Sequence, residues 1–308
     1  GKSLFTRCAA TKNLTSRFYR RVIGDVRALN KCVDAIYGGF AIRGAPRDVH
    51  DMTNPEPHRK CWANSLGDCA GSMSKEHIFS RAISRKGSKT EMAVKGMANM
   101  PDQLIGFDWP KARILCERHN SRLSPLDSEA KKLAEGLHQF VDGARHTTVH
   151  LSGLLLERWA LKTVINHMAA GFAHANRWLP NQDLVRNAFG LEPLPHGCGL
   201  YLLRVDGYEP VSTEQAGITL AWMGTEDGTP RECMGAIVYL HGATFFLLLQ
   251  THFLDVLRTN GLGFSNSGLP LTYDRLSYHP KKAQIDDGQG HTMLALFDWG
   301  LIGKPQSC

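Results

Sequence analysis

The sequence lacks the marks of exported, membrane-spanning and repetitive proteins. It does not begin with Met and its first residues contain no hydrophobic signal core, so we expect Gly1 to be a scar of processing. Its longest apolar run, residues 235–257, is interrupted by two histidines, a glycine and a glutamine. A membrane-spanning helix needs about 20 apolar residues, so this run predicts a hairpin instead. We therefore expect a soluble protein with no membrane partner, and we find no repeats or low-complexity segments.

Cysteine is too sparse and too scattered for a disulfide framework. The chain has 8 cysteines in 308 residues, and only Cys61, Cys69 and Cys116 lie in a grouping typical of metal ligands. Disulfide-stabilised exported domains are short and dense in cysteine. The pattern instead favours reduced thiols, a cytoplasmic location and one metal site.

Acidic residues are fewer than basic ones, and the difference bears on the kind of partner. The 36 Lys and Arg residues exceed the 29 Asp and Glu residues, which gives a formal net charge of +7. A basic chain favours polyanionic partners such as nucleic acid, although its charge says nothing about its fold. With 43% hydrophobic residues, a chain of this length can form two domains with a sizeable core.

Soft metal ligands form two pairs in the central part of the sequence. Cys61 and Cys69 are spaced C-x7-C, and Cys116 and His119 are spaced C-x2-H. Two such pairs, brought together around a tetrahedral ion, form a small knuckle. The spacing therefore predicts a structural zinc site.

Three alternatives to this zinc site remain open at the level of sequence. The four side chains could be unrelated buried or exposed groups. His119 could be a catalytic histidine beside Asn120, in a protein without zinc. His58, just upstream, could replace Cys69 as a ligand.

The same stretch resembles a known family of nucleases. Glu76-His77 precedes a hydrophobic pair, and Cys116-x2-His119-Asn120 then precedes an acidic residue at a predicted helix start. This order is similar to that of the HNH nucleases, whose core is the ββα-metal fold. It most resembles the zinc-stapled variant, which usually has Cys-x2-Cys-Asn where this chain has Cys-x2-His-Asn. The resemblance covers roughly residues 58–135.

The resemblance implies a role for each polar residue of the motif. His77 would be the general base, and histidine is the residue type suited to take a proton from water at neutral pH. Glu76 and Asp127 would be oxygen ligands of a catalytic divalent ion, Mg²⁺ or Mn²⁺. Asn120 would brace the loop and orient the base. Many relatives have a third histidine, and this chain has none at that position.

These residues also have plain structural alternatives. Ser124-x-x-Asp127 is a helix N-terminal cap with an acidic third position, which the helix dipole favours. Glu76 could be an exposed acid, and His77 could be a hydrogen-bonded core histidine.

Basic residues flank the motif and could contact nucleic-acid phosphates or form a solvated surface. They are Arg59, Lys60, Arg81 and Arg85. A predicted helix near residues 16–23 also interleaves arginines with aromatic residues. That helix could lie along a nucleic-acid backbone or be amphipathic with a solvated arginine face.

Secondary-structure signals predict an α+β protein of three parts. The sequence of residues 1–54 predicts a basic helical segment that ends at an Asn-Pro-Glu-Pro linker. Residues 55–144 predict the strand–strand–helix order of a ββα-metal HNH core with its zinc knuckle, the helix beginning at Ser124 and Pro125. Residues 145–308 predict an α+β domain with a mainly antiparallel sheet. Its expected elements are a helix at 153–170 and strands at 199–205, 216–222, 236–240, 244–249 and 292–298.

Together these observations favour a metal-dependent HNH-type endonuclease with a structural zinc ion. Its substrate would be nucleic acid, DNA more than RNA, in phage defence or in a mobile element. The C-terminal domain would recognise a target, a signal or a protein partner. One alternative is a zinc-stabilised nucleic-acid-binding module without catalysis. Another is an enzyme whose active site lies in the C-terminal domain, where we find no catalytic motif.

Overall fold

The protein has a mixed α+β fold with several antiparallel sheets, as the sequence predicts. The computed structural model describes residues 58–83, 91–94, 103–106, 111–171, 179–203, 216–224, 230–240, 243–251, 262–264, 269–271, 276–286 and 290–300. The predicted N-terminal helices, the linker and Arg85 lie outside these residues. Within them, no helix combines the length and apolarity needed to cross a bilayer.

A two-stranded antiparallel sheet and a long helix form the part of the fold that carries the motif. Strand β1 (Met73–His77) pairs with β4 (Lys111–Cys116), and α2 (Glu117–Val141) follows β4 directly. Along the chain, the segment that connects β1 to β4 contains the short helix η3 (Arg81–Ile83) and a separate hairpin. That hairpin consists of β2 (Glu91–Val94) and β3 (Gln103–Gly106). The sequence predicts strands near residues 74–80, 90–95 and 111–115, which correspond to β1, β2 and β4, and it does not predict β3.

Helix α2 begins at Glu117 and not at Ser124–Pro125, so the predicted helix start is wrong. Pro125 lies inside the helix and has no N–H to donate to the carbonyl of Ser121. The hydroxyl of Ser124 donates to that carbonyl instead, at 2.8 Å. This local bond replaces the missing backbone bond, so the helix continues through the proline. Ser124 is therefore no cap, and Asp127 lies in the helix interior.

The C-terminal strands form two further sheets. The five-stranded antiparallel sheet has the order β12-β6-β9-β8-β7, and a mixed sheet has the order β13-β14-β5, in which β14 and β5 are parallel. A hairpin, β10 (Leu262–Phe264) with β11 (Leu269–Leu271), lies apart. The other bounds are β5 (His146–Ser152), β6 (Gly199–Leu203), β7 (Ala216–Gly224), β8 (Pro230–Leu240), β9 (Ala243–Leu248), β12 (Leu276–Tyr278), β13 (Lys282–Asp286) and β14 (Thr292–Asp298).

The predicted C-terminal strands are confirmed as β6, β7, β8, β9 and β14. Strands β8 and β9 pair up to Leu240 and Ala243, as the predicted hairpin requires, and the two residues between them lie outside the described residues. Strand β5 was not predicted. Its partner β14 lies far along the chain, so no local turn signal indicates the pairing.

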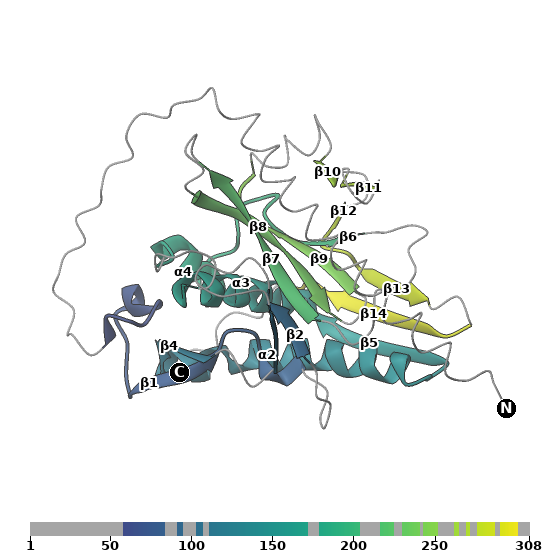
Figure 1. Cartoon of the computed structure of the whole chain (residues 1–308), viewed down its shortest axis with the longest axis horizontal. Helices are drawn as coiled ribbons and strands as arrows, with labels where there is room; N and C mark the ends of the chain where they lie inside the picture. Colours follow the sequence, from purple (N-terminus) through teal and green to yellow (C-terminus); the bar gives the residue numbers. More distant parts are fainter. Residues whose placement is uncertain are drawn as a thin grey trace.

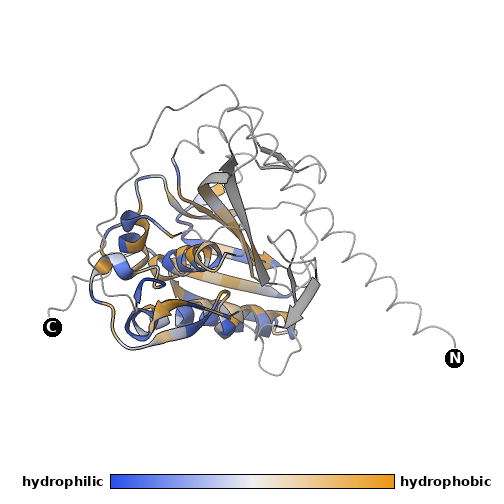
Figure 2. Cartoon of the chain, turned by 60° about the vertical axis from the view of Figure 1, so that its left-hand side comes forward, coloured by the Kyte–Doolittle hydropathy of each residue, from blue (hydrophilic) through white to orange (hydrophobic). Residues whose placement is uncertain are grey.

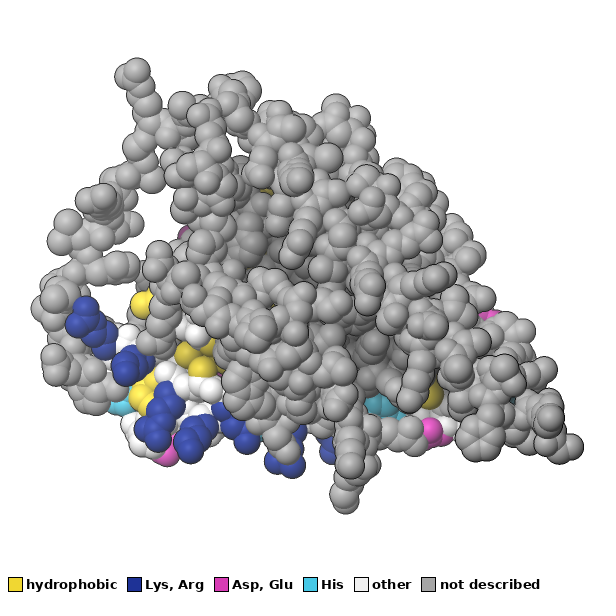
Figure 3. Space-filling model, in the orientation of Figure 1, with side chains coloured by type: hydrophobic (Ala, Val, Ile, Leu, Met, Phe, Trp, Pro, Cys, Tyr) yellow, Lys and Arg dark blue, Asp and Glu magenta, His cyan; other side chains and the backbone are white. Residues whose placement is uncertain are grey.

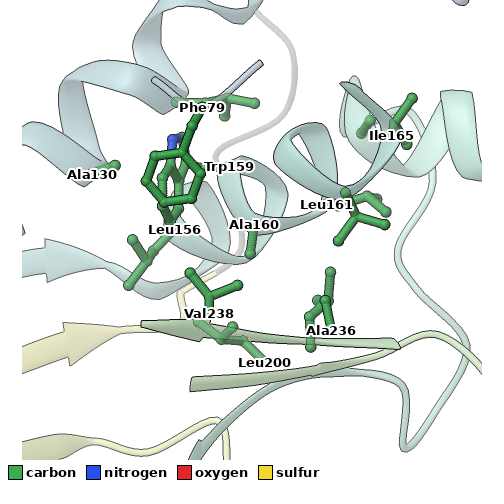
Figure 4. Close-up of a cluster of buried hydrophobic side chains, with 14 of the residues drawn as sticks. Phe79, Ala130, Leu156, Trp159, Ala160, Leu161, Ile165, Leu200, Ala236 and Val238 are labelled. Carbon is green, nitrogen blue, oxygen red and sulfur yellow. The ribbon is translucent and has the colours of Figure 1, made fainter. Parts of the chain in front are cut away.

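Helix α3 (Gly153–Ala169) lies between the motif-bearing part and the five-stranded sheet (Figure 1). Its predicted bounds are confirmed within one residue. Of its residues, 14 are buried, so other elements enclose this helix on nearly all sides. Figure 4 shows Leu156, Ala160 and Leu161 facing the sheet and Trp159 facing Phe79.

One hydrophobic cluster joins both parts through α3, from Cys61 near the beginning to Phe297 near the end. Helix α4 (Gln182–Ala188) packs against α3. Figure 2 shows α2, at the bottom of the view, with hydrophilic and hydrophobic residues on the same helix. Its buried residues, among them Leu123, Leu126 and Leu133, face this cluster.

Candidate metal centre and the adjoining acidic pair

Cys61, Cys69, Cys116 and His119 form one cluster, as the sequence predicts. Their ligand atoms, three sulfur atoms and one ring nitrogen, all lie within 4.8 Å of one another. Cys61 and Cys69 lie in the loop before β1, Cys116 ends β4, and His119 lies in the first turn of α2. The cluster does not include His58. These four residues could hold a metal ion such as zinc.

Backbone geometry brings the first ligand pair to the second. The N–H of Trp62 donates to the carbonyl of Ile114 at 2.9 Å, which holds the loop against β4. The N–H of Glu117 donates to the carbonyl of Ser72 at 2.9 Å, and this satisfies one of the free donors at the start of α2. The loop turns at Gly67, whose φ of 78° is left-handed and favours glycine.

The ligand distances fit a tetrahedral zinc ion. With zinc–sulfur bonds of about 2.3 Å and zinc–nitrogen bonds of about 2.0 Å, sulfur and nitrogen ligands lie about 3.5 Å apart. Nδ1 of His119 lies 3.5 Å from the sulfur of Cys61, 3.5 Å from that of Cys69 and 3.2 Å from that of Cys116. Four protein ligands complete the coordination of a structural zinc ion and leave no position for substrate.

Asp68 orients His119 for metal binding. Its Oδ1 lies 2.7 Å from Nε2 of His119, so Nε2 carries the proton and Nδ1 presents its lone pair to the cluster. Arg122 and Arg118 hold the other carboxylate oxygen at 2.8 and 3.3 Å. Burial works to raise the pKa of Asp68, but the bond with His119 and the two arginine charges outweigh it and lower that pKa. Burial lowers the pKa of His119, which favours the neutral, metal-binding ring.

The electrostatics of the thiols favour a bound cation. Burial raises the pKa of Cys61 to about 11, and burial together with the neighbouring thiols Cys61 and Cys116 raises the pKa of Cys69. A metal ion reverses this balance because it stabilises the thiolate directly. Metal binding therefore displaces protons from these sulfur atoms, and the affinity falls as the pH falls.

Phe189, directly after α4, covers the cluster from the C-terminal side. The edge of its ring meets the His119 ring at a centroid distance of 5.3 Å, and its ring lies 5.8 Å from that of Trp62. The guanidinium of Arg122 lies 5.0 Å from the same ring centroid. This apolar cover limits the access of water to the ligands, as structural metal sites require.

The two carboxylates predicted to hold a divalent ion lie together, bridged by a lysine. Nζ of Lys162, from α3, lies 2.8 Å from Oε1 of Glu76 and 2.7 Å from Oδ2 of Asp127. Lys162 and Glu76 are buried, and Asn120 hydrogen-bonds the Glu76 carboxylate. The structure therefore groups Glu76, Asn120 and Asp127, three of the four residues predicted for catalysis and its divalent ion.

The donor set does not fit a divalent ion as it stands. Mg²⁺ requires near-octahedral oxygen ligands at about 2.0–2.1 Å, whereas an oxygen of Glu76 and one of Asp127 already contact the Lys162 ammonium. Oδ1 of Asp127 is buried and accepts no hydrogen bond among the described residues. One remaining buried oxygen is too few, so this arrangement does not support the predicted Mg²⁺ or Mn²⁺ site.

His77 ends β1 on a basic side of the β1–β4 sheet. Its cross-strand partner is Lys111, and such partners project from the same side of a sheet. Lys75 and Arg113, at alternate positions of the same strands, are exposed. We call Lys75, Lys111 and Arg113 the basic face. Figure 3 shows Lys and Arg side chains gathered at the end of the molecule where β1 and β4 lie.

The predicted phosphate contacts lie near the β1–β4 sheet. Arg59, Lys60 and Arg81 are exposed, so their side chains are accessible to a phosphate group. The carbonyl of His77 lies 3.5 Å from the side-chain amide nitrogen of Asn166 in α3.

Sequence reasoning missed Asp68, Phe189 and Lys162. An acidic residue directly before a ligand could have indicated the partner of the histidine, because metal-binding histidines usually contact a carboxylate. No local signal connects Lys162 or Phe189 to the motif, since tertiary packing alone brings them there.

Comparison with protein-family models, with curated proteins and with solved structures found no match to this chain.

Proposed function

We propose that this protein is an endonuclease of the HNH type, with a structural zinc ion, that hydrolyses phosphodiester bonds in nucleic acid. The observation that carries the proposal is the strand–strand–helix unit with the four metal ligands at its strand–helix junction and His77 at the end of its first strand. The order of these parts is the one that the family resemblance implies.

His77 is the residue that would activate water. An imidazole near neutral pH can take the proton of a water molecule as the water oxygen attacks phosphorus, and the phosphorus–oxygen bond to the leaving group then breaks. Lys111 pairs with His77, and Lys75 and Arg113 are exposed on the same two strands. These charges suit a phosphate-bearing substrate, because phosphate contacts position nucleic acid.

The zinc ion would stabilise the fold and take no part in the reaction. All four of its positions would be filled by Cys61, Cys69, Cys116 and His119. A catalytic Mg²⁺ or Mn²⁺ would supply a charge at the scissile phosphate. Among the described residues, such an ion has no complete ligand set.

Replacement of His77 by Ala tests the proposal. We expect it to abolish cleavage of plasmid DNA while zinc content and nucleic-acid affinity stay near those of the parent, because a general base acts in the transition state and hardly in binding. His150→Ala, at an exposed histidine of β5, is the matched control. Equal cleavage by the parent and His77→Ala would exclude this mechanism.

One observation favours a second candidate, a zinc-stabilised nucleic-acid-binding module without catalysis. Lys162 makes an ion pair with both Glu76 and Asp127, as in a purely structural buried ion cluster. The assay separates the two: a binding module retains salt-sensitive affinity for nucleic acid, and its parent form cleaves neither DNA nor RNA with Mg²⁺, Mn²⁺ or chelator.

A further inference from the structure

Lys162 has an unusual place for a lysine. Its side chain is 2% exposed and comes from α3, a helix buried on nearly all sides. Its ammonium contacts two carboxylates from two other elements, Glu76 of β1 and Asp127 of α2. Buried lysines are rare unless they are paired, so the contact with this pair accounts for the lysine in the core.

The charges of the three groups depend on one another. Burial favours neutral forms and raises the pKa of Glu76, against the effect of the Lys162 charge. Burial works to lower the pKa of Lys162, but the charges of Glu76 and Asp127 outweigh it and raise that pKa. The ammonium is therefore a permanent cation at physiological pH.

Neighbouring contacts hold α3 in position. Asn166 follows Lys162 by about one helical turn, and its side-chain oxygen accepts the indole N–H of Trp62 at 3.0 Å. On the opposite side, Leu156 and Leu161 face the five-stranded sheet (Figure 4). Displacement of the lysine from the acidic pair would therefore disturb a helix that is packed on both sides.

We infer that Lys162 fills the cation position of the acidic pair, so that Glu76 and Asp127 bind the ammonium group of α3 in place of a divalent metal ion. A metal ion on the same oxygen atoms would lie next to a positive charge, and this repulsion is strong where water is excluded. The inference concerns the cation that the two carboxylates hold, so it does not depend on nuclease activity.

Manganese binding to the zinc-loaded full-length protein tests the inference, with free Mn²⁺ measured by its electron paramagnetic resonance signal. We expect Lys162→Met, which keeps the apolar stem and removes the charge, to bind Mn²⁺ at least about tenfold more tightly than the parent, a change of about 1.4 kcal/mol. Adding Glu76→Gln to this variant should remove the gain. Lys132→Met, at an exposed lysine paired with Glu129, is the matched control and should leave the affinity unchanged.

Two results would overturn the inference. One is an equal Mn²⁺ affinity of the parent and folded Lys162→Met. The other is a parent that binds Mn²⁺ and loses it in Glu76→Gln alone, because the carboxylate would then already hold a metal ion. If Lys162→Met does not fold, this comparison of the parent with Glu76→Gln decides the question, and equal affinities support the inference.

Discussion

At the scale of single residues, the metal ligands are expected to contribute most to stability. A structural zinc site couples metal binding to folding, because the unfolded chain does not hold its ligands together. We predict about one zinc ion per chain by elemental analysis. Cys116→Ala should lower both the zinc content and the melting temperature, since it removes a ligand buried at the start of α2.

The control for this substitution is another buried cysteine outside the cluster. Cys233, in β8, donates to a backbone carbonyl and takes no part in the metal site. Cys233→Ala should leave the zinc content unchanged even if it costs some stability. Folded, carefully purified parent protein without zinc would contradict the metal site altogether.

Because His167 is buried, we predict that the protein loses stability in mild acid. The ring is buried, its Nδ1 lies 2.8 Å from the carbonyl of Thr163, and burial lowers its pKa to about 4. A histidine of the unfolded chain has a pKa of about 6.5 and so binds the proton more tightly than the folded His167 does. The contribution of the neutral ring to the free energy of unfolding is therefore fully present above about pH 6.5 and is lost as the pH drops toward the folded pKa. Between about pH 7.5 and about pH 5.5 this loss is about 1.3 kcal/mol.

Urea unfolding at these two pH values measures the effect. Zinc release also destabilises the protein in acid, so the comparison needs variants with the same metal site. His167→Gln should lose about 1.3 kcal/mol less than the parent over this pH range, whereas His150→Gln, at an exposed position, should behave as the parent does. A pH dependence that is the same in all three proteins would show that His167 does not titrate as predicted.

Most of the candidate site could be predicted from single residues, because its chemistry depends on local spacing. The pair Cys116 and His119 lies one helical turn apart, and Glu76 directly precedes His77 at a strand end. The counter-ion of the acidic pair could not be predicted in this way. In the sequence, Lys162 is an ordinary polar residue of a helix, and only the tertiary packing shows that it is buried.

At the scale of elements, the contact of α2 with β5 depends on one glycine. A Cβ atom at Gly136 would lie 2.3 Å from Cγ2 of Val149, so the helix could not keep its distance from the strand. Gly136→Ala should destabilise the protein by about 1–3 kcal/mol through overpacking, although alanine favours a helix by about 1 kcal/mol.

A double substitution tests the cause of this loss. Val149→Ala removes the methyl group that the new Cβ would meet, so Gly136→Ala with Val149→Ala should be more stable than the sum of the single effects predicts. Urea unfolding of the four proteins gives this coupling free energy. Additive effects would place the cost of Gly136→Ala elsewhere.

The elements of the fold were predicted less evenly than the site residues. Periodicity identified α3 and the long strands β7, β8 and β9, because their patterns are strong and local. The start of α2 was missed because Ser124 and Pro125 have the composition of a helix start, and a single hydroxyl bond to Ser121 keeps them inside the helix. Strand β5 was missed because its pairing with β14 is parallel and distant.

At the scale of the whole molecule, the net charge of +7 predicts salt-sensitive binding of polyanions. The basic face is the part that should contact phosphates. Changing Lys75, Lys111 and Arg113 to Gln should weaken DNA binding and reduce the slope of log affinity against log salt by about 0.9 for each lost phosphate contact. The same change at Lys281 and Lys282, exposed near the other sheet, is the control for net charge.

Fluorescence anisotropy titrations at several salt concentrations measure this slope. A slope that changes by the same amount for each charge removed in both sets of variants would mean that total charge, and not the basic face, determines binding. Binding that does not respond to salt in the parent would mean that the positive charge is incidental.

The position of α3 also limits where the gene of this protein could be divided by recombination. Residues 58–141 contain every ligand of the metal cluster, but they lack the ammonium that contacts Glu76 and Asp127 and the amide that accepts the Trp62 indole N–H. A gene segment that ended at α2 would lose both contacts and would expose the apolar surface that α3 covers. The smallest transferable unit therefore extends through α3, and α3 carries with it the apolar surface that the five-stranded sheet covers.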